Sequence, residues 1–285
     1  MVILAGGLAL THLSLASPEP LLERSAGPPG GNAAVTAPLP SANQVIQRMM
    51  DRSAATAAAT NAPAWAYDKR TLLETLDGDA KVEERTEKLY RVRIIQGVPF
   101  SRLVKVAGHD LSAAEIKKEN EREAAFQKQL SGRDPKKVVK QREAFVTKDM
   151  VERFHYQVLR HETVKGRQTV VVRFEPKPGK DGGSLQDRLF NRLAGLLWVD
   201  EATGDVARLQ VQLTKELSLG VLGVLGAFKD LRMSLESTPM TDGTWLPDKT
   251  TMSVSARMFL STVRFQMEET SSHFTLESSR EPILP

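Results

Sequence analysis

The 285-residue sequence contains no cysteine. This excludes disulfide bonds, thiolate metal ligands, cysteine nucleophiles and a lipid anchor on an N-terminal cysteine. The chain also lacks a strong charge of one sign, because 39 Lys and Arg stand against 35 Asp and Glu and the formal net charge is +4. We find no basic stripe interleaved with aromatic residues, the pattern that nucleic-acid-binding domains show. The sequence therefore favours partners other than nucleic acid.

Catalytic signatures are also missing. There is no G-x-S-x-G, no P-loop and no G-x-G-x-x-G, and no lysine follows the glycines of "LGVLGVLG" at 219–226 in register. His155 and His161 lie six residues apart without a third ligand nearby, so surface histidines are favoured over a zinc site. The carboxylates near residue 85 alternate with Arg85 and Lys88, which indicates a charged strand face. We expect a protein that is not an enzyme and has no catalytic residue, metal or cofactor.

No segment reaches the ~18 consecutive apolar residues of a transmembrane helix. The first residues, "MVILAGGLALTHLSLASPEP", are apolar from Val2 to Leu10 and carry small residues at Ser14 and Ala16, as a secretory signal peptide does at its core and cleavage site. The basic start of such a peptide is missing, so we expect it to be incomplete. We predict a signal peptide at 1–16, a disordered linker rich in Pro, Gly, Ala and Ser at 17–40, and a periplasmic location.

Two long segments are predicted to be helical, one before the first strands and one between strands. Ser41 is a candidate N-cap for a helix at 42–58. Residues 112–150 are dense in strong helix formers and are predicted to form a solvated helical insertion, with a partner-binding surface as the alternative. Its thin apolar stripe is predicted to comprise Ile116, Phe126 and Leu130. A third, short amphipathic helix is predicted at 184–195, with leucines four residues apart.

About ten other segments alternate between apolar and polar residues, the period of strands with one buried face. The clearest hairpin is "LLWVDEATGDVARLQVQL" at 196–213, with its turn at Glu201 to Asp205. Consecutive hairpins of this kind predict one strongly curved antiparallel sheet. We therefore expect a single, mainly β domain at about 41–280, interrupted by the helical insertion.

Three stretches carry a resemblance to a known family: "GRQTVVVRFEPKPG" at 166–179, "LWVDEATGDVARLQVQL" at 197–213 and "WLPDKTTMSVSARM" at 245–258. They resemble the outer-membrane lipoprotein-sorting (LolA-like) family of periplasmic proteins. The resemblance implies an incomplete antiparallel β-barrel of about eleven strands with covering helices. It also implies an apolar concave face that holds lipoprotein acyl chains, and relatives of this shape include lipid-sensing regulators.

Methionines on the apolar faces of the late strands support a lipid site, because methionine adapts to irregular apolar surfaces. Plain core packing against the covering helices is the alternative. The predicted lipid-binding face consists of Tyr90, Leu209, Val211, Leu231, Met233, Leu235, Met252, Val254, Met258, Val263, Phe265 and Met267. The function predicted from the sequence is a carrier or sensor of lipid or lipoprotein acyl chains. The alternative is an envelope interaction or regulatory protein that uses the insertion or an open sheet edge to bind another envelope protein.

Overall fold

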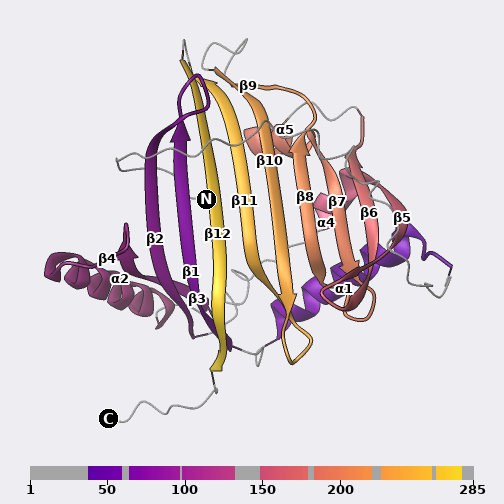
Figure 1. Cartoon of the computed structure of the whole chain (residues 1–285). Helices are drawn as coiled ribbons and strands as arrows, with labels where there is room; N and C mark the ends of the chain where they lie inside the picture. The colour runs from indigo at the N-terminus through magenta and orange to yellow at the C-terminus, as the bar shows by residue number, and fades with distance from the viewer. Residues whose placement is uncertain are drawn as a thin grey trace.

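The computed structural model describes residues 38–59, 64–96, 98–131, 148–178, 183–219, 226–258 and 261–277. They form a mainly β fold, as predicted: one large antiparallel sheet that does not close, with a few helices (Figure 1). The helices are α1 (Ala42–Ala58), α2 (Ala113–Ser131), α4 (Lys148–Glu152) and α5 (Leu185–Phe190). The strands are β1 (Ala64–Leu76), β2 (Val82–Ile95), β3 (Val98–Val106), β4 (His109–Asp110), β5 (Phe154–Val164), β6 (Arg167–Pro176), β7 (Leu193–Asp200), β8 (Val206–Leu213), β9 (Leu217–Leu219), β10 (Gly226–Pro239), β11 (Trp245–Met258) and β12 (Ser261–Glu277).

The order of the strands joins the two ends of the domain in the middle of the sheet. It runs β4-β3-β2-β1-β12-β11-β10-β8-β7-β6-β5, with β9 paired to β10. The first and the last long strands, β1 and β12, are therefore neighbours, and the sheet has open edges at β3–β4 and at β5. No helix in the described part of the chain is long and apolar enough to cross a membrane.

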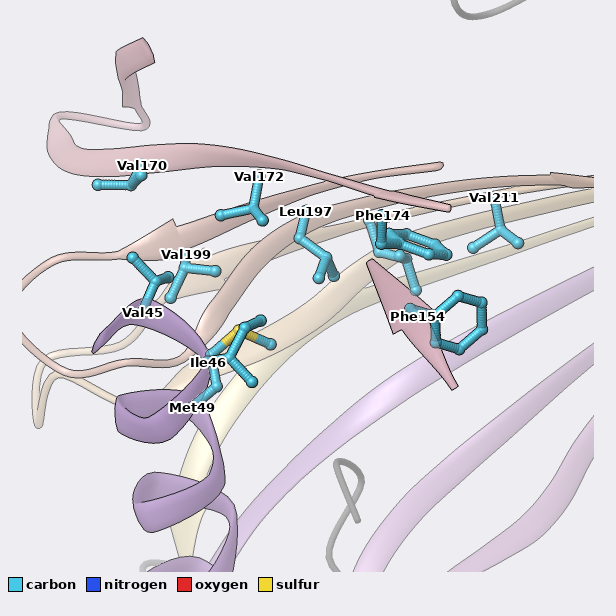
Figure 2. Close-up of a cluster of buried hydrophobic side chains, with 11 residues drawn as sticks. Val45, Ile46, Met49, Phe154, Val170, Val172, Phe174, Leu197, Val199 and Val211 are labelled. Atoms are coloured by element: carbon cyan, nitrogen blue, oxygen red, sulfur yellow. The ribbon is translucent and has the colours of Figure 1, made fainter. Parts of the chain in front are cut away.

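Helix α1 has the predicted bounds, and its start is fixed by a capping box. The Gln44 N–H donates to Ser41 Oγ at 3.3 Å, and the Ser41 N–H donates to Gln44 Oε1 at 2.9 Å. One side of α1 then buries Val45, Ile46 and Met49 against β5–β8. Figure 2 shows the strands arching over these side chains. We call the side of the sheet that α1 covers the inner face.

The β7–β8 hairpin holds α1 in place. The turn and β8 lie where the sequence predicts them, whereas β7 already begins at Leu193. Asp200 organises the turn by accepting from the backbone N–H groups of Ala202 and Thr203, both at 2.9 Å. Two arginines of α1 then bind the turn: Arg48 donates to the Glu201 carbonyl at 2.9 Å, and Arg52 pairs with Asp205 at 2.8 Å. The β7–β8 hairpin that the sequence predicts therefore binds the covering helix α1 through its turn.

A second, smaller core lies on the outer face, opposite α1. It consists of Val164, Val171, Leu196, Trp198, Ala207 and Trp245. Asp200 extends into this region, where it accepts from Trp245 Nε1 at 3.0 Å and pairs with Arg167 at 2.5 Å. These contacts lower the pKa of Asp200 to about 2, although burial alone would raise it. A carboxylate with 1% of its side chain exposed thus stays charged at neutral pH.

Helix α2 lies along the outer edge of β3 (Figure 1). Its side chains satisfy backbone groups that a further strand would otherwise bind: Glu119 accepts from the Leu103 N–H at 3.0 Å, and Arg122 donates to the Ser101 carbonyl. Such capping protects an open edge from pairing with another chain. The predicted apolar stripe is wrong in part: Leu130 is buried and Phe126 packs on Phe100, but Ile116 is 45% exposed. The packed side of α2 relies on the carboxylates of Glu119 and Glu123 instead.

The edge contact gives a local prediction. In Glu119→Ala the Leu103 amide loses its acceptor, and we expect it to exchange its hydrogen about tenfold faster, the equivalent of one modest hydrogen bond. Hydrogen exchange followed by NMR measures this rate. Glu121→Ala is the control, because Glu121 is exposed on the same helix. Unchanged Leu103 exchange in Glu119→Ala would show that α2 does not cap β3.

Two other predictions differ from the structure. The helix predicted at 184–195 ends at Phe190. Leu193 already begins β7, because residues 193–195 pair with β8. Most of the predicted helical insertion after Ser131 lies outside the described residues, and α4 covers only Lys148–Glu152. Residues 1–37, which include the predicted signal peptide and most of the predicted linker, also lie outside the described residues.

Candidate functional site

The inner face carries a continuous row of apolar side chains across the sheet. Cross-strand pairing places Val211 of β8 opposite Met233 of β10, Met233 opposite Met252 of β11, Met252 opposite Met267 of β12, and Met267 opposite Leu73 of β1. Since neighbouring strands lie about 4.8 Å apart, the row is about 20 Å long. We call these five residues the apolar row.

Burial differs between the two ends of the apolar row. Val211 is 8% exposed and belongs to the core under α1. Met233, Met252 and Met267 are half-buried, and Leu73 is 39% exposed. In the part of the chain that the structure describes, no helix contacts β11, β12 or β1 as α1 contacts β5. The same apolar surface thus begins as sealed core and continues as an accessible face.

Register places all twelve residues predicted for lipid binding on the inner face. Leu231, Val254 and Phe265 form a second apolar line beside the row. Leu209 lies in the core beneath α1, and the half-buried Leu235 packs against that core. Met258, at the end of β11, and Val263, near the start of β12, are 42% and 39% exposed.

The third line of the inner face changes from apolar to polar as it leaves α1. It runs from Leu235 through Thr250, Glu269 and Thr71 to Lys88 of β2. Tyr90, the predicted site residue on β2, lies two positions beyond Lys88 and opposite Lys69 of β1. Lys69 Nζ lies 5.4 Å from the Tyr90 ring centroid, and burial raises the pKa of Tyr90. Tyr90 therefore lies, with Lys69, Thr71, Lys88 and Glu269, at the edge of the apolar surface. We call these five residues the polar border.

Two further residues of this face, Leu73 and Lys88, were not predicted from the sequence. Leu73 lies in "RTLLETL", where adjacent leucines give no alternation, so its face became clear only from pairing with Met267. Lys88 was assigned to a charged strand face. In the strand register, the Cα of Lys88 lies opposite that of Thr71, which places Lys88 on the inner face. The side chain of Glu87 instead forms an ion pair with Arg70 on the outer face.

The described residues contain no cluster suited to a metal ion. No three His, Asp or Glu side chains there lie close enough together to hold a metal ion. His161 contacts Glu201 at 2.7 Å, so it supports the hairpin turn beside α1. What the inner face offers is apolar area bordered by charge.

Comparison with known proteins gives structural neighbours only. No family model and no curated protein matches the sequence. A structure assigned as an outer membrane lipoprotein-sorting protein domain from Vibrio parahaemolyticus is 12% identical over 85% of this chain and 95% of that chain, with a TM-score of 0.32. A LolA superfamily protein from Nitrosomonas europaea is 11% identical over 82% of this chain and 94% of that chain, with a TM-score of 0.30.

A further similar structure is the MucA/MucB complex of Pseudomonas aeruginosa, which is 9% identical over 84% of this chain and 99% of that chain, with a TM-score of 0.25. The structures to which the chain is similar include LolA-superfamily and lipoprotein-sorting proteins, the family that the sequence resembles.

Proposed function

We propose that this chain is a periplasmic, non-enzymatic carrier or sensor that binds lipid or lipoprotein acyl chains on its inner face. The observation that carries the proposal is the apolar row, which continues from the core under α1 to half-buried methionines and an exposed Leu73. An acyl chain lying on this row gains about 0.8 kcal/mol for each methylene that it buries. Three adjacent methionines adapt to chains of different shape at little cost.

The envelope interaction protein is the second candidate, and the capped edge of β3 is the observation that bears on it. Glu119 and Arg122 of α2 occupy the backbone groups through which a partner strand would add to this edge. The edge is therefore blocked in this conformation, whereas the apolar row is accessible. This contrast favours the inner face as the binding surface.

Leu73→Glu tests the proposal. Leu73 lies at the accessible end of the row, so a carboxylate there stays hydrated and the fold is retained. Bound acyl chains would lose apolar contact and face a charge, and we expect affinity for N-phenyl-1-naphthylamine, a neutral apolar dye, to fall about tenfold. Fluorescence titration gives the affinity, and thermal melting confirms the fold.

Val104→Glu is the matched control, because Val104 is 36% exposed on β3, away from the apolar row. It receives the same charge and should bind the dye as the wild type does. Equal dye affinity in all three folded proteins would contradict the proposed site. A wild type without dye binding that purifies with a stoichiometric protein partner would favour the interaction protein instead.

A further inference from the structure

The polar border of the inner face holds more positive than negative charge available to a ligand. The carboxylate of Glu269 already has partners within the protein. Lys69 Nζ lies 3.3 Å from its Oε1, and Thr71 Oγ1 donates to the same oxygen at 3.0 Å. Arg122, near Tyr90, is likewise paired, with Glu119 at 2.6 Å. The cations and anions of these pairs largely cancel.

Lys88 is the exception. It is half-buried on the inner face, and no described residue forms an ion pair with it. The inner face of β2 also carries Glu84, but this carboxylate lies four residues away, about 13 Å along the strand, and has an interaction of its own. A half-buried ammonium group without a counter-ion attracts an anion more strongly than a fully hydrated one does.

Lys88 also has a neighbour suited to an oxyanion. Tyr90 lies two residues along on the same face, about 7 Å away, and its raised pKa keeps the phenol protonated and able to donate a hydrogen bond. Thr86 separates Lys88 from Glu84 and lies opposite Leu73, the last residue of the apolar row. A cation and a phenol therefore lie beside the end of an apolar track.

On the basis of the proposed function, we infer that the preferred ligand is a fatty acid, with its alkyl chain on the apolar row and its carboxylate at Lys88 and Tyr90. One uncompensated cation matches a head group with one negative charge. The carboxylate accepts hydrogen bonds from Lys88 Nζ and Tyr90 Oη, while the charge of Lys69 is already balanced by Glu269. Charge-assisted hydrogen bonds of this kind orient a chain that apolar contact alone would leave free to slide.

Isothermal titration with laurate and lauryltrimethylammonium tests the inference, because the two share one alkyl chain and differ in head charge. The wild type is expected to bind laurate about tenfold more tightly than the cation, and Lys88→Gln to lose about tenfold in laurate affinity. Lys88→Arg should retain laurate binding. The laurate preference should weaken at high salt, because the site is half-exposed.

Lys249→Gln is the matched control, since Lys249 lies on the outer face paired with Glu268 at 2.9 Å and the variant has the same net charge as Lys88→Gln. It should leave both affinities unchanged. Equal wild-type affinity for the two probes, or a folded Lys88→Gln with full laurate affinity, would overturn the inference and leave the proposed function standing. Failure of the wild type to bind either probe would overturn both.

Discussion

Gly195→Ala is expected to destabilise the protein by about 3 kcal/mol or more, beyond the usual range for an overpacked core. A Cβ at this position of β7 would lie 1.9 Å from the Gln210 carbonyl oxygen and 2.9 Å from the Phe174 ring. The carbonyl belongs to the backbone of β8, and it cannot withdraw without separating the two paired strands. Figure 2 shows Phe174 in the cluster with Phe154 under the sheet, which leaves the ring little room to move.

Chemical denaturation at neutral pH measures this loss. Gly78→Ala is the control, because a Cβ there would meet no atom within 4 Å, and we expect it to change stability by less than about 0.5 kcal/mol. A Gly195→Ala protein as stable as the wild type would show that β7 and β8 are not paired in the register described.

Asp200→Ala is expected to cost about 3 kcal/mol. The buried carboxylate accepts from Trp245, from two backbone N–H groups of the turn and from Arg167, and its removal leaves these donors without an acceptor. The hairpin turn that seats α1 would lose its organising residue. Asp110→Ala removes an exposed ion pair with Lys105 and should cost less than about 1 kcal/mol. Similar losses in both variants would contradict the role assigned to Asp200.

The same carboxylate gives stability a dependence on acid pH. The pKa of Asp200 is about 2 in the folded protein against 3.8 for an ordinary aspartate, so the unfolded chain binds the proton more readily. This contribution, about 2 kcal/mol, is complete above pH 4 and is lost as the pH falls from about 4 to 2. At pH 6, Asp200→Asn should be less stable than the wild type. Between pH 4 and 2, the free energy of unfolding of Asp200→Asn should fall less than that of the wild type. Parallel stability curves for the two proteins would contradict the lowered pKa.

Local signals explain which parts of the fold the sequence predicts well. Helix α1 was predicted with its bounds and the β7–β8 hairpin with its turn, because a capping residue and a turn-forming segment are encoded within a few positions. Leucine spacing extended the third helix into β7, since it does not reveal that Leu193 pairs with Leu213 of a later strand. Likewise, the stripe through Ile116 was chosen for hydrophobicity, whereas α2 packs through carboxylates that meet arginines of β2 and β3.

The candidate site shows the same division. Alternation places the twelve predicted residues on one face, as the register shows. It does not reveal how far α1 covers that face, because the order of strands depends on β1 pairing with β12 across most of the chain. Alternation therefore predicted which residues share a face, while the boundary between sealed core at Val211 and accessible surface at Leu73 required the structure.

The central claim, that acyl chains lie on the inner face, is tested most directly by photo-crosslinking a fatty acid with a diazirine in its chain and mapping the labelled residues by mass spectrometry. We predict labels on Met233, Met252 and Met267, whose side chains line the apolar row. Their strand neighbours Ser234, Ser253 and Gln266 lie on the outer face and should remain unlabelled. Labels on these outer-face residues would contradict the account. So would the absence of any labelling that an excess of unlabelled fatty acid abolishes.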